Sequence, residues 1–216
     1  MKSLSCWFYV LISLLSAPLV FALEIGSPEA GAAKAATCTA CHGPNGNSVT
    51  PLFATLAGQN AAYLTGQLKH FKDNTRINSA GVMMGMALTL DDQGMADVAA
   101  YFSTQTPTGL EADPSYWQAG RQLYRGGDTA RGIPACLACH GPSGHGNPAA
   151  AYPALRAQHA EYVVKQLGDY AAGKRYSTND KGESNGGPDA VIMSTIAQRL
   201  SPEDMRNLAS YVQGLR

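Results

Sequence analysis

Residues 38–44 of the chain read Cys-Thr-Ala-Cys-His-Gly-Pro, and residues 136–142 read Cys-Leu-Ala-Cys-His-Gly-Pro. In each stretch two cysteines stand three positions apart, and a histidine directly follows the second cysteine. One helical turn takes about 3.6 residues, so this spacing gathers both thiols and the imidazole around a single turn. Such a turn presents two sulfurs and one ring nitrogen to the same face of a flat group.

The Cys-x-x-Cys-His pattern is typical of covalent haem attachment. Each sulfur forms a thioether with one haem vinyl group, and the histidine meets the iron from one side of the ring. We therefore predict two covalently bound haem c groups, each containing iron. The expected cofactor-binding residues are Cys38, Cys41, Cys136 and Cys139, and the expected iron-ligating histidines are His42 and His140.

Paired cysteines also occur in thioredoxin-type redox sites and in zinc sites. A redox pair would follow a strand in a βαβ unit, and the sequence has no useful run with the period-two alternation of a strand. The two pairs lie 98 residues apart, which is wide for a single four-cysteine zinc site. Neither alternative explains the histidine that follows both pairs.

The two motifs belong to a larger internal repeat. Matching residues recur at an offset of 99 after the motifs and at an offset of 110 further on. Matches that keep their order while the offset grows indicate a duplicated unit with insertions. The matches are Leu56, Gln59, Tyr63, Gln67 and Leu68 with Leu155, Gln158, Tyr162, Gln166 and Leu167, then Met83, Leu90, Ala99 and Tyr101 with Met193, Leu200, Ala209 and Tyr211.

Both copies are predicted to be all-α. A middle helix is expected over Ala61 to Lys72 and again over Ala160 to Ala172, because apolar residues recur there at spacings of three and four. The expected N-caps are Ser27 and Asp113 for the first helices, each followed by proline, and Asp91 and Ser201 for the last helices. The expected inward-facing stripes of the last helices are Met95, Val98, Ala99 and Phe102 in one copy and Met205, Leu208, Ala209 and Val212 in the other.

The charge and the start of the chain limit the function further. Sixteen basic and sixteen acidic side chains cancel, so the chain lacks the positive excess of a nucleic-acid-binding protein. Residues 1–22 have a basic start, an apolar run and small residues at the end, as a secretory signal peptide does. We expect cleavage after Ala22, which removes Cys6. The apolar run is short for the alternative, an uncleaved membrane anchor.

The expected organisation is therefore a signal peptide over residues 1–22, an N-terminal domain over 23–106 and a C-terminal domain over 107–216. Thr104 to Pro114 is rich in threonine, proline, glycine and acidic residues, and it makes a suitable linker.

Methionine is the expected second axial ligand of each iron, because it favours ferrous iron in small haem electron carriers. In the second copy, Met193 is the sole methionine between the motif and the last helix, seven residues before Leu200. In the first copy Met83 also stands seven residues before its equivalent leucine, so we choose Met83 over Met84 and Met86. The alternative is that these methionines only fill gaps in the core.

The three remaining histidines are not expected to bind iron. None of them stands at a position where both copies have histidine, so a solvent-facing or helix-capping role is the simplest expectation. These residues are His70, His145 and His159.

An iron held by histidine on one side and methionine on the other has no open position for peroxide or oxygen. Such an iron exchanges electrons with little rearrangement of its ligands. The sequence therefore predicts an electron carrier without catalytic residues, in which two nearby haems can exchange an electron.

The chain resembles the dihaem cytochrome c4 family over essentially all of residues 23–216. The resemblance rests on both haem motifs, residues 56–59 (Leu-Ala-Gly-Gln), the spacing from Met193 to Leu200 and the ending at residues 210–215. It implies two class I cytochrome c domains related by a pseudo-twofold axis, with haem propionate edges near each other. It also implies axial ligation by Met83 and Met193.

The resemblance further implies a periplasmic protein, soluble or loosely attached to the membrane. Such a protein carries electrons from a cytochrome bc complex towards a terminal oxidase. Two alternatives stay open: the cytochrome subunit of a dehydrogenase of the flavocytochrome sulfide dehydrogenase type, and a catalytic dihaem enzyme such as a peroxidase or a thiosulfate-oxidising protein.

The two copies differ at the residue whose carbonyl accepts a hydrogen bond from the haem histidine in this family. The second copy has Pro153, and the first has Ala54. Alanine keeps the carbonyl but leaves the backbone freer than proline does. We therefore predict unequal midpoint potentials for the two haems. A redox titration of the intact protein that gave two indistinguishable midpoints would contradict this prediction.

Overall fold

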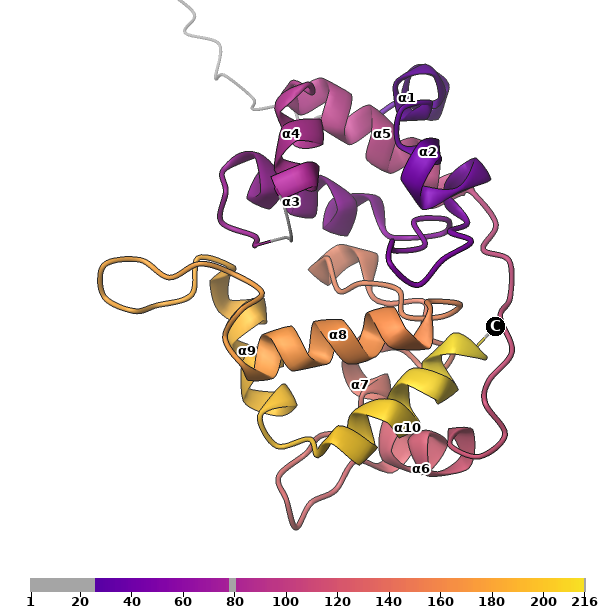
Figure 1. Cartoon of the computed structure of the whole chain (residues 1–216), viewed down its shortest axis with the longest axis vertical. Coiled ribbons are helices and arrows are strands. Elements are labelled where there is room, and N and C mark those ends of the chain that lie inside the picture. Colours follow the sequence, from indigo (N-terminus) through magenta and orange to yellow (C-terminus); the bar gives the residue numbers. More distant parts are fainter. Residues whose placement is uncertain (1–25, 78–80, 216) are drawn as a thin grey trace, which may run out of the picture.

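A computed structural model describes residues 26–77 and 81–215, so the proposed signal peptide lies outside the described residues. The described chain forms two helical lobes joined by an extended segment (Figure 1). Within these ranges the β-structure is limited to isolated bridges, which confirms the all-α prediction. No helix of the described part is long and apolar enough to cross a membrane.

The same order of five α-helices occurs in each lobe, as the repeat predicts. The first lobe contains α1 (Pro28–Ala35), α2 (Thr39–His42), α3 (Ala61–Lys72), α4 (Val82–Leu88) and α5 (Asp92–Thr104). The second contains α6 (Trp117–Gly126), α7 (Leu137–His140), α8 (Ala160–Ala171), α9 (Gly187–Ala197) and α10 (Pro202–Gln213). The growth of the offset from 99 to 110 comes from the longer loop between α8 and α9, which projects from the second lobe (Figure 1), and from the earlier start of α9 relative to α4.

Three of the four predicted N-caps are confirmed. The Ser27 hydroxyl accepts a hydrogen bond from the Ala30 amide, Asp91 caps α5 through the amide of Gly94, and Ser201 forms a capping box with Asp204. Each cap satisfies an amide that would otherwise be unpaired at the start of its helix.

The fourth predicted cap, at Asp113, is wrong. The Asp113 carboxylate accepts a hydrogen bond from the Ser115 amide, two residues on, at 2.8 Å. An aspartate that bonds two residues ahead closes a turn rather than a helix. The chain turns through Pro114, and α6 begins only at Trp117.

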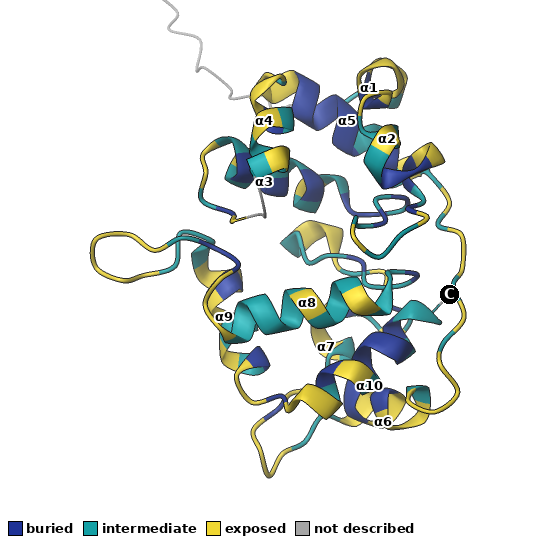
Figure 2. Cartoon of the chain, viewed as in Figure 1, coloured by how far each residue is buried: buried dark blue, intermediate teal, exposed yellow. Residues whose placement is uncertain are grey.

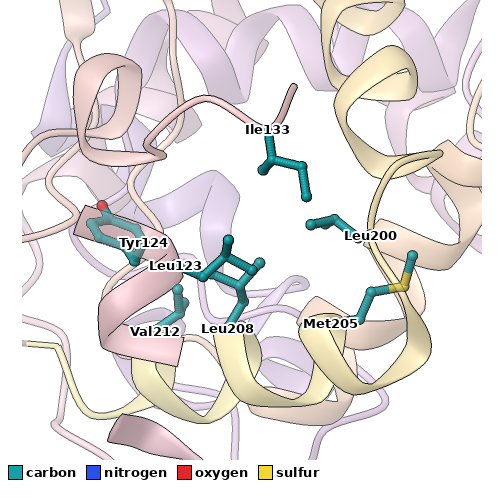
Figure 3. Close-up of a cluster of buried hydrophobic side chains, with 7 residues drawn as sticks. All are labelled: Leu123, Tyr124, Ile133, Leu200, Met205, Leu208 and Val212. Carbon is teal, nitrogen blue, oxygen red and sulfur yellow. The ribbon is translucent and has the colours of Figure 1, made fainter. Parts of the chain in front are cut away.

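The predicted apolar stripes of α5 and α10 form the centres of the two cores, which are dark blue in Figure 2. Met95 and Met205 are 0% and 8% exposed, so both fill the core as expected. Figure 3 shows the side chains of the second core converging between α6 and α10. This core consists of Leu123, Tyr124, Ile133, Leu200, Met205, Leu208 and Val212, and the smaller first core consists of Ala35, Leu64, Val98, Ala99 and Phe102.

In each lobe the first and last helices cross at a glycine. A Cβ atom on Gly31 in α1 would lie 2.0 Å from the backbone oxygen of Asp97 in α5. A Cβ atom on Gly120 in α6 would lie 1.9 Å from the backbone oxygen of Asn207 in α10. These crossings bring the backbones of the first and last helices into close contact in each lobe. They therefore fix the relative positions of the helices that support each motif.

Replacing Gly120 by alanine tests this crossing. We expect Gly120→Ala to lower the free energy of unfolding by about 1–3 kcal/mol, because the new methyl group forces α6 away from α10. Guanidinium unfolding of the haem-loaded protein, followed by circular dichroism, measures the change. Gly126→Ala in the same helix is the matched control, since no atom lies within 4 Å of a Cβ there. Equal stability of the two variants would contradict the close crossing.

The carboxylate of Asp97 ties the N-terminal segment of the first lobe to α5. It accepts hydrogen bonds from the Ser27 amide at 2.9 Å and from the Gln93 side chain at 2.8 Å, and it pairs with Lys34. The hydrogen bond from Lys34, followed by those from Ser27 and Gln93, lowers the pKa of Asp97 to about 2.

Because the folded pKa of Asp97 lies below the unfolded value of about 3.9, its contribution is complete above that value and is lost as the pH falls towards 2. Asp97→Asn should therefore destabilise the protein at neutral pH, and the difference from the wild type should shrink below pH 4. The second lobe carries Asn207 at the equivalent position, so asparagine fits the space. Urea unfolding as a function of pH measures the difference. A difference that stayed constant down to pH 2 would contradict the role of the carboxylate.

Candidate haem sites

The first motif places a neutral imidazole in the interior of the first lobe. His42 ends the short helix α2 and is 8% exposed. Its Nδ1 atom lies 2.7 Å from the backbone oxygen of Ala54. A carbonyl oxygen only accepts, so Nδ1 carries the proton and Nε2 keeps its lone pair. This Nε2 atom is buried and has no hydrogen-bond partner.

The second motif repeats this arrangement. His140 ends α7, is 7% exposed and has its Nδ1 atom 2.9 Å from the backbone oxygen of Pro153. The bond to Ala54 in the first lobe is therefore present without proline, and it is no longer than its counterpart. Both imidazoles are oriented by one backbone carbonyl each.

Burial keeps both imidazoles neutral. Desolvation lowers the pKa of His42 below its usual range, against the smaller raising effect of the hydrogen bond to Ala54, and the charge of Arg76 lowers it further. Desolvation likewise lowers the pKa of His140, against the hydrogen bond to Pro153. A neutral imidazole with a free Nε2 lone pair is the form that ligates a metal.

The four motif cysteines are unpaired thiols. Burial raises the pKa of Cys136 to about 11 and raises that of Cys38 as well, so these two side chains remain protonated. In the described part of the chain no group of three or more histidine, cysteine or acidic side chains could hold a bare metal ion. The four motif cysteines therefore do not come together as a four-cysteine zinc site among the described residues.

The residues fit haem c. Each short helix presents two free thiols and one oriented imidazole, and the orphaned Nε2 atom of His42 needs an electron-pair acceptor such as iron. Beside the second motif an apolar groove of about 610 Å³ lies between Ile133 and Pro134 on one side and Ile192 and Ile196 of α9 on the other. Apolar walls of this kind suit a porphyrin.

The candidate methionines lie in α4 and α9, two helices that the sequence analysis did not predict. Met83 and Met193 are both half-buried, and each stands four residues before an alanine that is 0% exposed, Ala87 or Ala197. Residues four apart share one helix face. The two methionines therefore occupy equivalent positions on the inward side of equivalent helices.

The other methionines of α4 are also half-buried, so burial alone does not separate Met83 from Met84 and Met86. Their equivalents in α9 are Ser194 and Ile196. Only Met83 has a methionine as its counterpart.

The sequence contained two features that could have predicted α4 and α9. These are the apolar run at residues 82–88 and the proline at the start of α9.

The three remaining histidines have separate roles in the structure. His145 is exposed, as expected. His159 stands at the N-cap position of α8, as a capping residue would, but its side chain does not cap the helix. Its Nε2 atom lies instead 2.8 Å from the backbone oxygen of Ser48 in the other lobe. His70 pairs through Nδ1 with the Thr75 hydroxyl at 2.9 Å.

Two glutamines at equivalent positions join the lobes beside the motif histidines. The Oε1 atom of Gln59 accepts a hydrogen bond from the backbone amide of Ala154 at 2.7 Å, and the Nε2 atom of Gln59 donates one to the backbone oxygen of Ala154 at 2.8 Å. The side chain of Gln158 bonds the backbone of Thr55 in the same way, at 2.9 and 3.0 Å. Ala154 and Thr55 each follow a residue whose carbonyl holds a motif histidine. The sequence repeat marked both glutamines but did not reveal this exchange across the lobes.

Comparisons with known proteins agree with this geometry. The family model for cytochrome c matches residues 29–106 and 118–216. The chain is 47% identical over 197 residues to cytochrome c4 of Azotobacter vinelandii, an alignment that covers 88% of this chain and 90% of the relative. It is 33% identical to a thiosulfate dehydrogenase electron acceptor of Thiomonas intermedia, which covers 83% of this chain and 78% of the relative.

A solved structure shows the same fold. The crystal structure of reduced recombinant cytochrome c4 from Pseudomonas stutzeri matches with a TM-score of 0.78 and 42% identity, covering 88% of this chain and all of that one. Two tandem class I cytochrome c domains with two covalently bound haem c groups account for the duplicated helices and for both motifs. The chain thus belongs to the cytochrome c4 family, as a dihaem cytochrome that transfers electrons.

Proposed function

We propose that the protein is a periplasmic electron carrier in which both irons are closed by histidine and methionine. One haem is attached to Cys38 and Cys41, and the other to Cys136 and Cys139. The axial pairs are His42 with Met83 and His140 with Met193. The observation that carries this proposal is the pair of neutral, carbonyl-oriented imidazoles, matched by equivalent methionines on α4 and α9.

When bound, haem iron supplies a reversible one-electron change between the ferrous and ferric states. The residues of the chain prepare the site for that change. The carbonyls of Ala54 and Pro153 fix the tautomer and the plane of each imidazole, and burial lowers the pKa of both histidines and so favours the neutral form. The thioethers of the methionines would close the opposite side and exclude small reactants.

A closed site makes the protein a carrier without catalytic residues of its own. Residues 23–106 and 107–216 each hold one haem, and the exported chain begins after Ala22. Its partners are redox proteins, with a cytochrome bc complex as donor and a terminal oxidase as acceptor. Association with the membrane surface would be peripheral.

The likeness to a thiosulfate dehydrogenase electron acceptor favours a second candidate function. In this reading a periplasmic dehydrogenase supplies the electrons instead of a cytochrome bc complex. The site chemistry is the same in both readings. Co-purification with a dehydrogenase, and reduction by it at a rate that exceeds reduction by a cytochrome bc complex, would support this second candidate.

Carbon monoxide tests the closed sites. Carbon monoxide binds ferrous haem only where an axial position is open. The reduced wild-type protein should therefore bind no carbon monoxide within minutes of its addition. Met193→Ala should bind one equivalent per chain, because alanine leaves the second iron without its sixth ligand. Met205→Leu, a change at a buried core methionine, is the control and should bind none. Rapid binding by the wild type would contradict the proposal and favour a catalytic haem.

The same assay decides which methionine of α4 ligates the first iron. Met83→Ala should bind one equivalent of carbon monoxide, and Met84→Ala and Met86→Ala should each bind none. All three residues lie on one short helix, so a general loosening of α4 would open the site in all three variants. Binding by Met86→Ala alone would assign the ligand to Met86 instead.

A further inference from the structure

Between its first helix and its haem motif, the second lobe carries a loop for which the first lobe has no equivalent. In the first lobe two residues separate the end of α1 from Cys38. In the second lobe residues 127–135 stand between the end of α6 and Cys136. We call residues 127–135 the inserted loop. It makes the surroundings of the second motif different from those of the first.

The inserted loop is closed by its own backbone. The backbones of Asp128 and Ile133 exchange two hydrogen bonds, each 2.8 Å long. Gly127 and Gly132 bend the loop at φ angles of +65° and +66°, a region that is unfavourable for a residue with a Cβ atom. A Cβ atom on Gly127 would also lie 2.4 Å from the backbone oxygen of Ile133. The loop therefore has one defined shape.

Arg131 fastens the inserted loop to α10. Its Nη1 and Nη2 atoms donate to the two carboxylate oxygens of Asp204 at 2.6 and 3.3 Å, and its Nε atom donates to Asp128 at 2.6 Å. The hydrogen bond from Arg131 is the largest of the effects that lower the pKa of Asp204 to about 2, so this carboxylate is charged at neutral pH. The Arg131 side chain is 43% exposed, but a two-point pair within a network is stronger than a single surface ion pair.

Arg199 ties the same loop to α9. It stands directly after the C-cap of α9 and donates from Nη1 to the backbone oxygen of Gly132. A Cβ atom on Gly132 would lie 2.5 Å from this Nη1 atom, so the close approach depends on glycine. The inserted loop is thus held from two sides, by α9 through Arg199 and by α10 through Arg131.

The loop held in this way forms one wall of the apolar groove beside the second motif. Ile133 and Pro134 line the groove on the side opposite Ile192 and Ile196 of α9. Ile133 is 2% exposed and also belongs to the second core, where Figure 3 shows it directed towards Leu200. The position of the loop therefore sets the width of the groove that fits the porphyrin.

An apolar wall acts on haem through water. Water stabilises the more highly charged ferric form, so a wall that excludes water raises the midpoint potential. We propose that Arg131 is a positioning residue that holds the inserted loop against the second haem and so excludes water from it. The short connection before Cys38 provides no equivalent wall for the first haem. The loop thus raises the midpoint potential of the second haem in particular.

This inference rests on a bound haem in each lobe and does not depend on which methionine ligates either iron. It adds a second source of inequality between the haems to the difference between Ala54 and Pro153. It also assigns a role to the Arg131–Asp204 pair, which lies outside both haem motifs.

Arg131→Gln in the haem-loaded protein tests the positioning role. Hydrogen exchange followed by mass spectrometry should show the amides of Asp128 and Ile133 exchanging faster, on the order of tenfold, as for the loss of one charged hydrogen bond. A redox titration followed by NMR resolves the haem methyl signals of each lobe. It should show a lower midpoint for the second haem and an unchanged midpoint for the first.

Asp204→Asn separates the position of the loop from the direct effect of charge. This substitution weakens the same pair but removes a negative charge, so a purely electrostatic effect would raise the second midpoint. Release of the loop should lower it, as in Arg131→Gln. Because both residues act through one contact, the double variant should lower the midpoint no further than the larger of the two single changes.

Lys165→Gln is the matched control. Lys165 pairs with Asp169 on α8 of the same lobe, so this change removes one positive charge from a pair outside the inserted loop. It should leave the exchange of the loop and both midpoints unchanged.

Two results would overturn the proposal. One is a higher second midpoint in Asp204→Asn with a lower one in Arg131→Gln, which charge alone explains. The other is faster exchange of the loop with both midpoints unchanged, which would make the pair a support for the loop only. A haem count of two and unchanged circular dichroism in each variant exclude a failure of haem attachment or folding. The carbon monoxide assay is a separate measurement, so either proposal can fail without the other.

Discussion

A hydrogen bond from a buried imidazole to one backbone carbonyl determines the chemistry of each half of this molecule. It places the proton on Nδ1 of His42 or His140 and leaves Nε2 free for iron. Two cysteines on the same helical turn can then fasten a porphyrin against that nitrogen. A covalent tether suits lobes of this size, because each contributes only a small core of its own. The close crossings at Gly31 and Gly120 fix the first and last helices of each lobe against one another.

The carbonyl that orients each imidazole also connects the site to the other lobe. Gln59 and Gln158 bind the residues directly after Pro153 and Ala54, so a shift of either lobe would disturb the loop that holds the opposite histidine. Two nearly symmetrical halves therefore share one contact that reciprocal hydrogen bonds hold together. Asymmetry enters behind the imidazoles, where the accepting carbonyl belongs to Ala54 in the first lobe and to Pro153 in the second. This local difference is the basis on which we predict unequal midpoint potentials for the two haems.

Much of the fold could be predicted because the repeat and the helix signals were local. The bounds of α3 follow the amphipathic pattern to the residue, and those of α8 to within one. The helices α4 and α9 were missed, because short apolar segments without a polar face carry no clear periodicity. Asp113 resembled a helix cap but closes a turn. The contacts of His159, Arg76 and Arg175 could not be predicted from the sequence. Their hydrogen-bond partners lie about 100 residues away along the chain, in the other lobe.

The claim on which this account depends is that both motifs carry covalently attached haem in one exported chain. Intact-protein mass spectrometry under denaturing conditions tests it directly, because a thioether-bound haem survives unfolding and a ligand held only by packing does not. The account predicts a single species with the mass of residues 23–216 plus two haems. A chain that carried one haem or none after expression with a functional haem-attachment system would contradict it.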